Sequence, residues 1–245
     1  MSDTGRSEIG SAINTFYGLK TANTDNGTIV YATSEEAARD GLYRLDANGT
    51  TKHYFGAGDV KYVDRDGNGE INDADRTVIG DANPDIYGNI FTSLSYKGLR
   101  LDVGFNYSLG GDVYNYNRQQ LESGSRFMNQ TTAMLRRWSY EGQVTDIPQA
   151  TYGDPMGNSA FSDRWIEDGS YLRLKHITLS YQLPINNTYI QGISVWVRAN
   201  NVFTLTKYLG ADPEFSMGNG VLFQGIDRGL LSQGRSFNVG VKINL

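Results

Sequence analysis

The sequence has no cysteine, and only two of its 245 residues are histidines, His53 and His176. Without cysteine, a thiolate nucleophile, a zinc finger and a cysteine-based redox site are all excluded. Two histidines also argue against a histidine-rich transition-metal site. No run approaches the roughly 18 consecutive apolar residues of a transmembrane helix. The first ten residues, MSDTGRSEIG, lack the apolar stretch of a signal peptide.

Basic residues are also in short supply. The 22 lysines and arginines are outnumbered by 27 acidic residues, giving a net charge of −5. A nucleic-acid-binding domain normally carries a basic patch, so we expect no nucleic-acid partner. Proline is scarce at 5 residues, whereas glycine (29), tyrosine (16) and phenylalanine (10) are abundant, which favours a turn-rich β protein. The mean hydropathy of −0.45 also fits a membrane β-barrel, because only alternate strand residues face lipid.

Six segments alternate apolar and polar residues with a period of two, which is typical of strands with two different faces. The clearest is 98–108, in which every second residue is apolar: Leu99, Leu101, Val103, Phe105 and Tyr107. The other five segments are 12–20, 86–96, 171–183, 192–203 and 237–245. Within 171–183 the alternation shifts phase at His176, which predicts a β-bulge near Lys175 and His176.

The connections between these segments alternate in length. Three are long, at about 21–85, 109–170 and 204–234, and two are short, at 97–98 and 184–191. Short turns at one end and long extracellular loops at the other are typical of outer-membrane barrels. The predicted fold is therefore all-β, an antiparallel transmembrane β-barrel segment with long extracellular loops. Six strands are fewer than the roughly eight of the smallest bacterial barrels, so either weak strands hide in the long loops or the rest of the barrel is missing. We favour the second alternative, and therefore expect an incomplete barrel and a chain that is a piece of a longer protein.

Features of the loops and strand ends add finer predictions. Met134, Leu135 and Trp138 lie at helical spacing and predict a short helix over 129–141. Aromatic residues near strand ends suit the interfacial girdle of a barrel: Tyr96, Tyr107 and Tyr181. Aromatic residues in the loops are candidates for stacking on sugar rings or peptide side chains: Tyr114, Tyr116, Tyr152 and Phe161.

The sharpest local motif is DRDGNGEINDAD at 64–75, inside the first long loop. It matches the D-x-[DN]-x-[DN]-G pattern of calcium loops, whose hard oxygen ligands wrap a cation. Gly69 stands at the position of the sharp turn. The candidate ligands are Asp64, Asp66, Asn68, the backbone carbonyl of Glu70, Asn72 through water, and Asp75. We expect a structural calcium site that stiffens the loop. The alternative is a polar turn in which Asp and Asn side chains cap their own backbone.

The last strand carries a second signal. Asn238, Gly240, Ile243 and Leu245 resemble the C-terminal signature by which the barrel-assembly machinery takes up outer-membrane proteins, although a terminal aromatic residue is usual where Leu245 stands.

Several stretches together resemble TonB-linked outer-membrane proteins of the SusC/RagA type from Bacteroidota. They are FYGLK (16–20), AGDVKYVDRDGNGEINDADRTVIGDANPDIYGN (57–89), RWIEDGSYLRLKHITLSYQLP (164–184), RANNVFTLTKYLGADPE (198–214) and GRSFNVGVKINL (234–245). Their order and spacing match the C-terminal third of that family, so residues 1–245 resemble the C-terminal portion of a TonB-dependent receptor barrel.

The resemblance implies a barrel of about 22 strands in the bacterial outer membrane. It also implies nutrient import of glycans or oligopeptides with a SusD-like lipoprotein as the lid, driven by the TonB complex through a plug and TonB box that this sequence lacks. Polar residues of the strands would line the lumen: Arg100, Asp102, Asn106, Lys242 and Asn244.

Two other interpretations stay open at this point. One is a calcium-stabilised cell-surface β domain that binds carbohydrate. The other is a glycoside hydrolase fragment that uses carboxylates such as Asp163, Glu167 and Asp168. The stretch SDRWIEDGSY around these carboxylates shows no independent sign of a cleft, and the common P-loop, GxSxG and HExxH motifs are absent. We therefore predict that the chain is not an enzyme.

Overall fold

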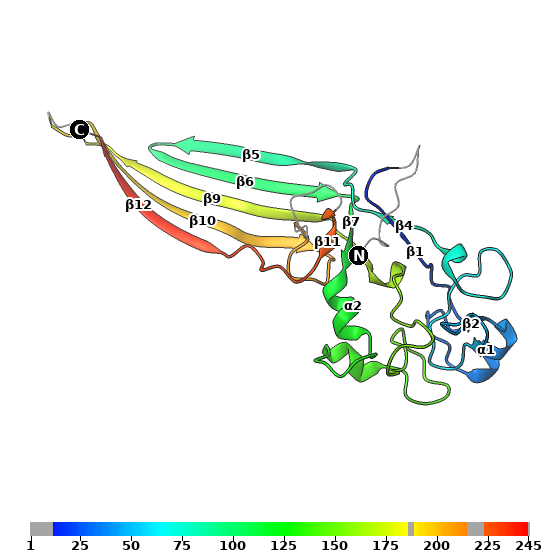
Figure 1. Ribbon diagram of the computed structural model, residues 1–245. Helices are drawn as coiled ribbons and strands as arrows, with labels where there is room; N and C mark the ends of the chain where they lie inside the picture. Colours follow the sequence, from blue (N-terminus) through cyan, green and yellow to red (C-terminus); the bar gives the residue numbers. More distant parts are fainter. Residues whose placement is uncertain (1–11, 186–188, 215–222, 245) are drawn as a thin grey trace. The chain divides into compact units, whose positions relative to one another are not determined.

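The computed structural model describes residues 12–185, 189–214 and 223–244 (Figure 1). The chain divides into two compact units, which we call the sheet unit and the loop unit. The sheet unit comprises 83–112, 168–215 and 230–245, and the loop unit comprises 1–82, 113–167 and 216–229. Among the described residues, no helix is long and apolar enough to cross a membrane.

The sheet unit is a five-stranded antiparallel sheet in the order β12-β10-β9-β6-β5. Its strands are β5 (Ile86–Tyr96), β6 (Leu99–Leu109), β9 (Tyr171–Leu183), β10 (Gly192–Thr206) and β12 (Ser236–Asn244). Each strand pairs with its neighbour along the chain, which makes an up-and-down meander (Figure 1). With 9 to 15 residues, these strands have the length needed to cross the hydrocarbon layer when tilted. They coincide with five of the six segments predicted from alternation.

Two local features set the register of this sheet. Lys97 and Gly98 form the β5–β6 turn, and both have positive φ angles (45° and 84°), as a two-residue turn that matches the strand twist requires. The predicted bulge is confirmed: Gly104 of β6 pairs with His176, and the next residue, Phe105, pairs with Leu174, so Lys175 is skipped.

One face of the sheet is apolar across all five strands. A continuous row of paired residues runs Leu94, Leu101, Leu179, Val197 and Val239. A second row runs Tyr96, Leu99, Tyr181, Val195 and Val241. In this chain most of these side chains are exposed. A wide exposed apolar surface is a mark of an interaction face, and here the rows span the whole sheet.

The opposite face is polar. One row runs Ser93, Asp102, Thr178, Arg198 and Asn238, and the next runs Ser95, Arg100, Ser180, Trp196 and Gly240. Asp102 accepts hydrogen bonds from Ser93 Oγ at 2.6 Å and Arg100 Nε at 3.0 Å, and Arg198 Nε donates to Thr178 Oγ1 at 2.8 Å. Two of the residues predicted to line a lumen, Arg100 and Asp102, thus lie in these polar rows and are hydrogen-bonded to each other.

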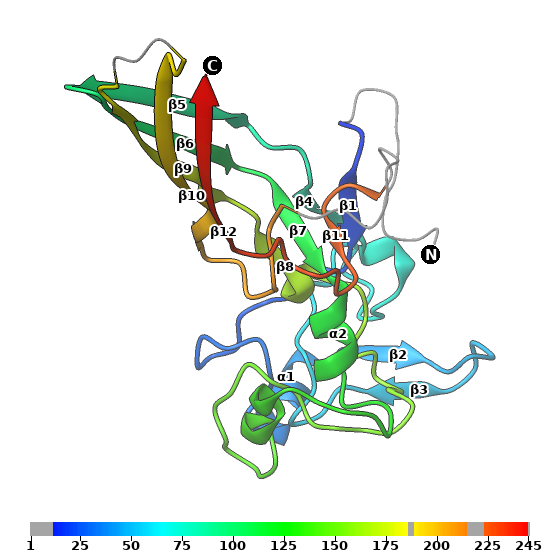
Figure 2. The ribbon, with the colours of Figure 1, turned by 90° about the vertical axis from the view of Figure 1, so that its left-hand side faces the viewer.

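The loop unit is built from short elements (Figure 2). Two-stranded sheets form between β1 (Thr15–Gly18) and β4 (Thr77–Asp81) and between β2 (Tyr43–Leu45) and β3 (Lys52–Tyr54). β11 (Ile226–Asp227), β7 (Asp112–Asn115) and β8 (Ile166–Asp168) form a third sheet. The helices are α1 (Ser34–Asp40) and α2 (Tyr116–Glu122), with 3-10 turns η1 (Asp73–Asp75), η2 (Thr132–Arg136) and η3 (Asp163–Trp165).

Two apolar clusters hold the loop unit together. The first contains Leu19, Val30, Tyr31, Ala37, Phe55, Val60, Tyr62 and Ile71. The second contains Phe16, Ala82, Tyr114, Trp165 and Ile226. The first cluster comes from the start of the chain and the first long connection, whereas the second joins residues of all three long connections, so parts of these connections pack together in the loop unit.

One prediction about this unit holds in part and another is wrong. Segment 12–20 does contain a strand, the four-residue β1, but this strand pairs with β4 and is not part of the large sheet. Phe16 and Thr15 are both buried, so neighbouring residues lack the exposed face that a barrel strand presents. The helix expected over 129–141 is reduced to the single 3-10 turn η2, where Met134 is buried and the adjacent Leu135 is exposed. The backbone of Arg137 is no longer helical, with φ −56° and ψ 152°, and this separates Trp138 from the turn.

Candidate functional site

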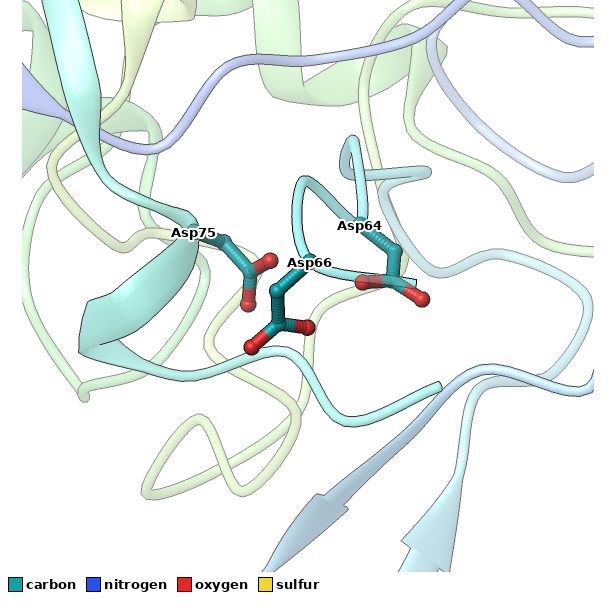
Figure 3. Close-up of side chains that lie close together, drawn as sticks. All are labelled: Asp64, Asp66 and Asp75. Carbon is teal, nitrogen blue, oxygen red and sulfur yellow. The ribbon is translucent and has the colours of Figure 1, made fainter. Parts of the chain in front are cut away.

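The calcium-type loop gathers three carboxylates, Asp64, Asp66 and Asp75 (Figure 3). One oxygen from each lies within 4.8 Å of the others. Asp75 is fully buried, Asp64 half-buried and Asp66 exposed. Calcium binds oxygen at about 2.3–2.6 Å, so two oxygens on opposite sides of one ion lie at most about 5 Å apart. The spacing of the three carboxylates therefore fits a shared calcium ion.

Backbone amides shape the loop around Asp64. Its two carboxylate oxygens accept hydrogen bonds from Gly67 N and Gly69 N, both at 2.8 Å. Gly69 has a φ angle of +81°, which only glycine adopts readily, as the turn position of the motif requires. Desolvation raises the pKa of Asp64, but the amide donors from Gly69 and Gly67 outweigh it and hold that pKa below its usual range. The carboxylate therefore stays charged at neutral pH.

Of the other predicted ligands, Asn68 lies next to the carboxylates, whereas Asn72 has a capping role. Asn68 lies beside Asp66 and donates from Nδ2 to Asp66 Oδ2 at 2.8 Å, while its own Oδ1 accepts from Glu70 N at 2.6 Å. Asn72 caps η1, with Oδ1 accepting from Ala74 N at 2.7 Å. A ligand role for the Glu70 carbonyl, and one through water for Asn72, stay predictions.

Asp75 closes the loop. Its carboxylate accepts from Arg65 N at 2.8 Å and from Asn72 N at 2.9 Å. Within the described part of the chain, no lysine or arginine forms an ion pair with Asp75, Asp64 or Asp66. Three converging carboxylates without a cationic side chain repel one another, and a divalent cation would remove that repulsion.

The loop is joined to the β2–β3 hairpin. Tyr43 N donates to Gly69 O at 3.0 Å, and Ile71 N donates to Tyr43 O at 2.8 Å, so Glu70 pairs with β2. Ile71 itself is buried in the first apolar cluster. An ion held by the loop would therefore stiffen both the hairpin and the core beside it.

The acidic residues considered for hydrolysis have separate partners. Glu167 accepts from Arg118 Nη1 at 2.8 Å, and Asp163 accepts from Thr21 N at 3.0 Å. Asp168 accepts from Ser170 N at 2.9 Å, and hydrogen bonds from Ser170 lower its pKa. Each carboxylate stabilises a local turn or packing contact.

A feature missed by the sequence reasoning lies on the polar face of the sheet. Arg173 of β9 is buried and donates to Thr204 Oγ1 at 2.9 Å, to Glu214 Oε2 at 2.6 Å and to Asp212 Oδ1. The two acidic residues belong to the segment that follows β10. Alternation alone does not single out Arg173, because every strand carries polar residues on this face.

A second segment is held at the same place. Lys175, the bulged residue, donates from Nζ to Gln233 Oε1 at 2.7 Å, and Gln233 N donates to Asp212 Oδ2 at 3.3 Å. Residues 207–214 and 230–235, which we call the strap, thus lie on the polar face over Arg173. A cavity of about 260 Å³ lies between the strap and β10, lined by Asn201 and Thr204 among others.

Most of the predicted assembly signature lies on the outermost strand β12, where Asn238 pairs with Arg198 and Ile243 with Ile193. The indole of Trp196 covers Gly240, so closely that any side chain at that glycine would clash with the ring. Leu245 lies outside the described residues. Recognition by the assembly machinery stays a prediction.

Comparison with known proteins places this sheet in context. No family model matches the chain. TonB-dependent receptor P3 of Formosa agariphila is 34% identical over 190 residues, which cover 74% of this chain and 18% of that receptor. TonB-dependent receptor SusC of Bacteroides thetaiotaomicron is 27% identical over 169 residues, covering 64% of this chain and 15% of SusC.

Solved structures agree with this comparison. The RagAB peptide importer in its closed-closed state matches 98% of this chain and 24% of its own, with a TM-score of 0.65 and 24% identity. By sequence and fold, the chain belongs to the SusC/RagA-type TonB-dependent receptors. Such receptors are outer-membrane β-barrel proteins, and the five-stranded sheet is part of an incomplete barrel. The chain spans less than a quarter of the length of the curated receptors that it matches.

Proposed function

We propose that this chain forms part of the barrel wall and extracellular loops of an outer-membrane nutrient importer. The observation that carries the proposal is the pair of faces on the five-stranded sheet. Apolar rows such as that of Leu101, Leu179 and Val197 would face lipid, and the polar rows beside Asp102 would line a water-filled lumen. The long loops between the strands would lie on the extracellular side.

Substrates and partners follow from the related receptors. The importer would take up glycans or oligopeptides with a SusD-like lipoprotein as its lid. Energy would come from the TonB complex, acting through other parts of the full-length receptor. This chain would contribute wall, loops and lumen lining, and no catalytic step.

Uptake by cells tests the import proposal. Cells expressing the full-length receptor would be incubated with fluorophore-labelled oligosaccharide and oligopeptide pools. We expect accumulation of at least one pool that disappears when either the receptor gene or the TonB complex is deleted. Equal accumulation of both pools with and without the receptor would contradict import by this protein.

The calcium-type loop would hold a structural calcium ion in this importer. Three hard carboxylates at suitable spacing support this proposal, and no lysine or arginine that the structure describes forms an ion pair with them. Asp66 suits a test, because it is exposed and its carboxylate accepts from Asn68 alone among the described residues. The nearby Asp73 is a matched control, since its side chain is 89% exposed and pairs with Arg76.

Limited trypsinolysis of the receptor measures calcium binding at this loop, because trypsin can cleave at Arg65 within it and at Lys61 and Arg76 on either side. With calcium, we expect cleavage between 59 and 80 to slow several-fold in the wild type and in Asp73→Asn. Chelator, or Asp66→Asn, should remove this protection, since a lost carboxylate weakens a site of few ligands. Cleavage that chelator leaves unchanged in the wild type would show that the loop is a self-capped turn.

A further inference from the structure

The structure separates the loop aromatic residues into two groups. Tyr114 is buried in the second apolar cluster of the loop unit, and Tyr116 and Phe161 pack against it. Tyr152 is instead 74% exposed and stacks on Phe127, which is 96% exposed, with ring centroids 5.3 Å apart and planes at 29°. Phe127 contributes almost nothing to the core, so folding alone gives no reason for an aromatic residue there.

Hydrogen bonds hold the backbone segments that carry the two rings. Gly153 N donates to Ser125 O at 3.0 Å, which ties the two segments together. The Asp154 carboxylate accepts from Asn158 N at 2.7 Å and from Ser159 N at 2.9 Å. Rigid presentation reduces the conformational entropy lost when a ligand binds to the rings.

The sequence around Phe127 is positive in an otherwise acidic chain. The stretch 123–140 contains three arginines and no acidic residue: Arg126, Arg136 and Arg137. All three are exposed, and none forms an ion pair with a residue that the structure describes. Met134 of η2 packs against Gly124, which brings the turn that carries Arg136 close to the segment of Phe127.

We propose that Phe127 and Tyr152 form a binding platform for an anionic oligosaccharide, one with carboxylate or sulfate groups. The apolar C–H face of a pyranose ring packs on the open face of an aromatic ring, and burying both removes apolar surface from water. Arg126, which is exposed and precedes Phe127 in the sequence, would bind the acidic group, because a guanidinium recognises planar oxyanions through paired N–H donors. This proposal rests on the proposed import function and specifies the class of substrate.

Binding measurements on the full receptor in detergent test the platform. The probes are an oligogalacturonate hexasaccharide, a chondroitin sulfate hexasaccharide and neutral cellohexaose, measured by titration calorimetry. Phe127→Ala and Tyr152→Ala remove one ring each, and Arg126→Gln removes the charge. Tyr54→Ala is the matched control, because Tyr54 is also exposed and packs on another ring, that of Tyr43.

We expect at least one anionic probe to bind more tightly than cellohexaose. Both ring variants should weaken that binding at least tenfold and Arg126→Gln at least threefold, with no change in Tyr54→Ala. Absence of anionic binding, equal binding by all variants, or preference for cellohexaose would overturn the proposal. It would also be overturned if the ring variants lost a co-purifying lipoprotein but kept the sugar, since the surface would then dock protein. Uptake assays separate the two ideas, because a receptor that fails to import still binds the probe.

Discussion

Leu179 and Ser180 are neighbours on β9, yet their side chains lie on opposite faces of the sheet. Leu179 pairs with Leu101 and Val197 in an apolar row, whereas Ser180 pairs with Arg100 and Trp196 in a polar row. In a barrel the first contacts hydrocarbon and the second contacts water. The cost of a charge at these two positions should therefore differ greatly.

A pair of arginine substitutions measures this difference. Leu179→Arg should lower the free energy of unfolding of the membrane-inserted receptor by about 1–3 kcal/mol, because arginine on the lipid face costs about 2–4 kcal/mol at mid-bilayer and less toward the interface, where the neighbouring row of Tyr96 and Tyr181 lies. Ser180→Arg should change it by less than about 0.5 kcal/mol, as surface substitutions usually do. Denaturant titration in lipid vesicles gives both values, and equal losses would contradict the assignment of faces.

Single residues were predictable where a motif fixes spacing. Asp64, Asp66 and Asp75 come together as the calcium-loop pattern predicts, because the turn at Gly69 is local. Arg173 was not predictable, because its acidic partners Asp212 and Glu214 lie about 40 residues away and only the fold brings them together.

At the scale of elements, alternation located the strands of the large sheet and the bulge at Lys175, since both depend on which face each residue takes. Alternation also predicted the strand β1, but it could not show that β1 pairs with β4 instead of joining the large sheet. The helix α1 was missed despite its local signals. Thr33 accepts from Glu36 N at the start, and Gly41 ends the helix in the left-handed conformation.

The strap offers an element-scale prediction. Arg173→Met leaves Asp212 buried without its cation, and removing one partner of a buried pair typically costs about 3–5 kcal/mol. Amides held by Asp212, those of Glu214 and Gln233, should then exchange with deuterium at least about tenfold faster. Arg198→Met is the control, because Arg198 bonds Thr178 on the same face without touching the strap. Unchanged exchange in Arg173→Met would mean that other contacts hold the strap.

For the whole molecule, the sequence separated long connections from strands but did not show that parts of these connections pack into one unit. That packing depends on contacts between distant segments, such as Tyr62 Oη donating to Gly157 O at 2.7 Å. Local periodicity carries no information about such pairs. The resemblance to known receptors explains the open edges of the five-stranded sheet, because further strands would pair with them and complete the barrel.

Spin labels along β9 test the central claim most directly, and the absence of cysteine from this chain favours single-cysteine labelling. The sites would be residues 177–182, with the full receptor in lipid vesicles. Labels at 177, 179 and 181 should be relaxed by oxygen dissolved in lipid, and labels at 178, 180 and 182 by a water-soluble nickel complex. Relaxation that fails to alternate with a period of two, or odd positions shielded from both reagents, would contradict a wall with lipid on one face and water on the other.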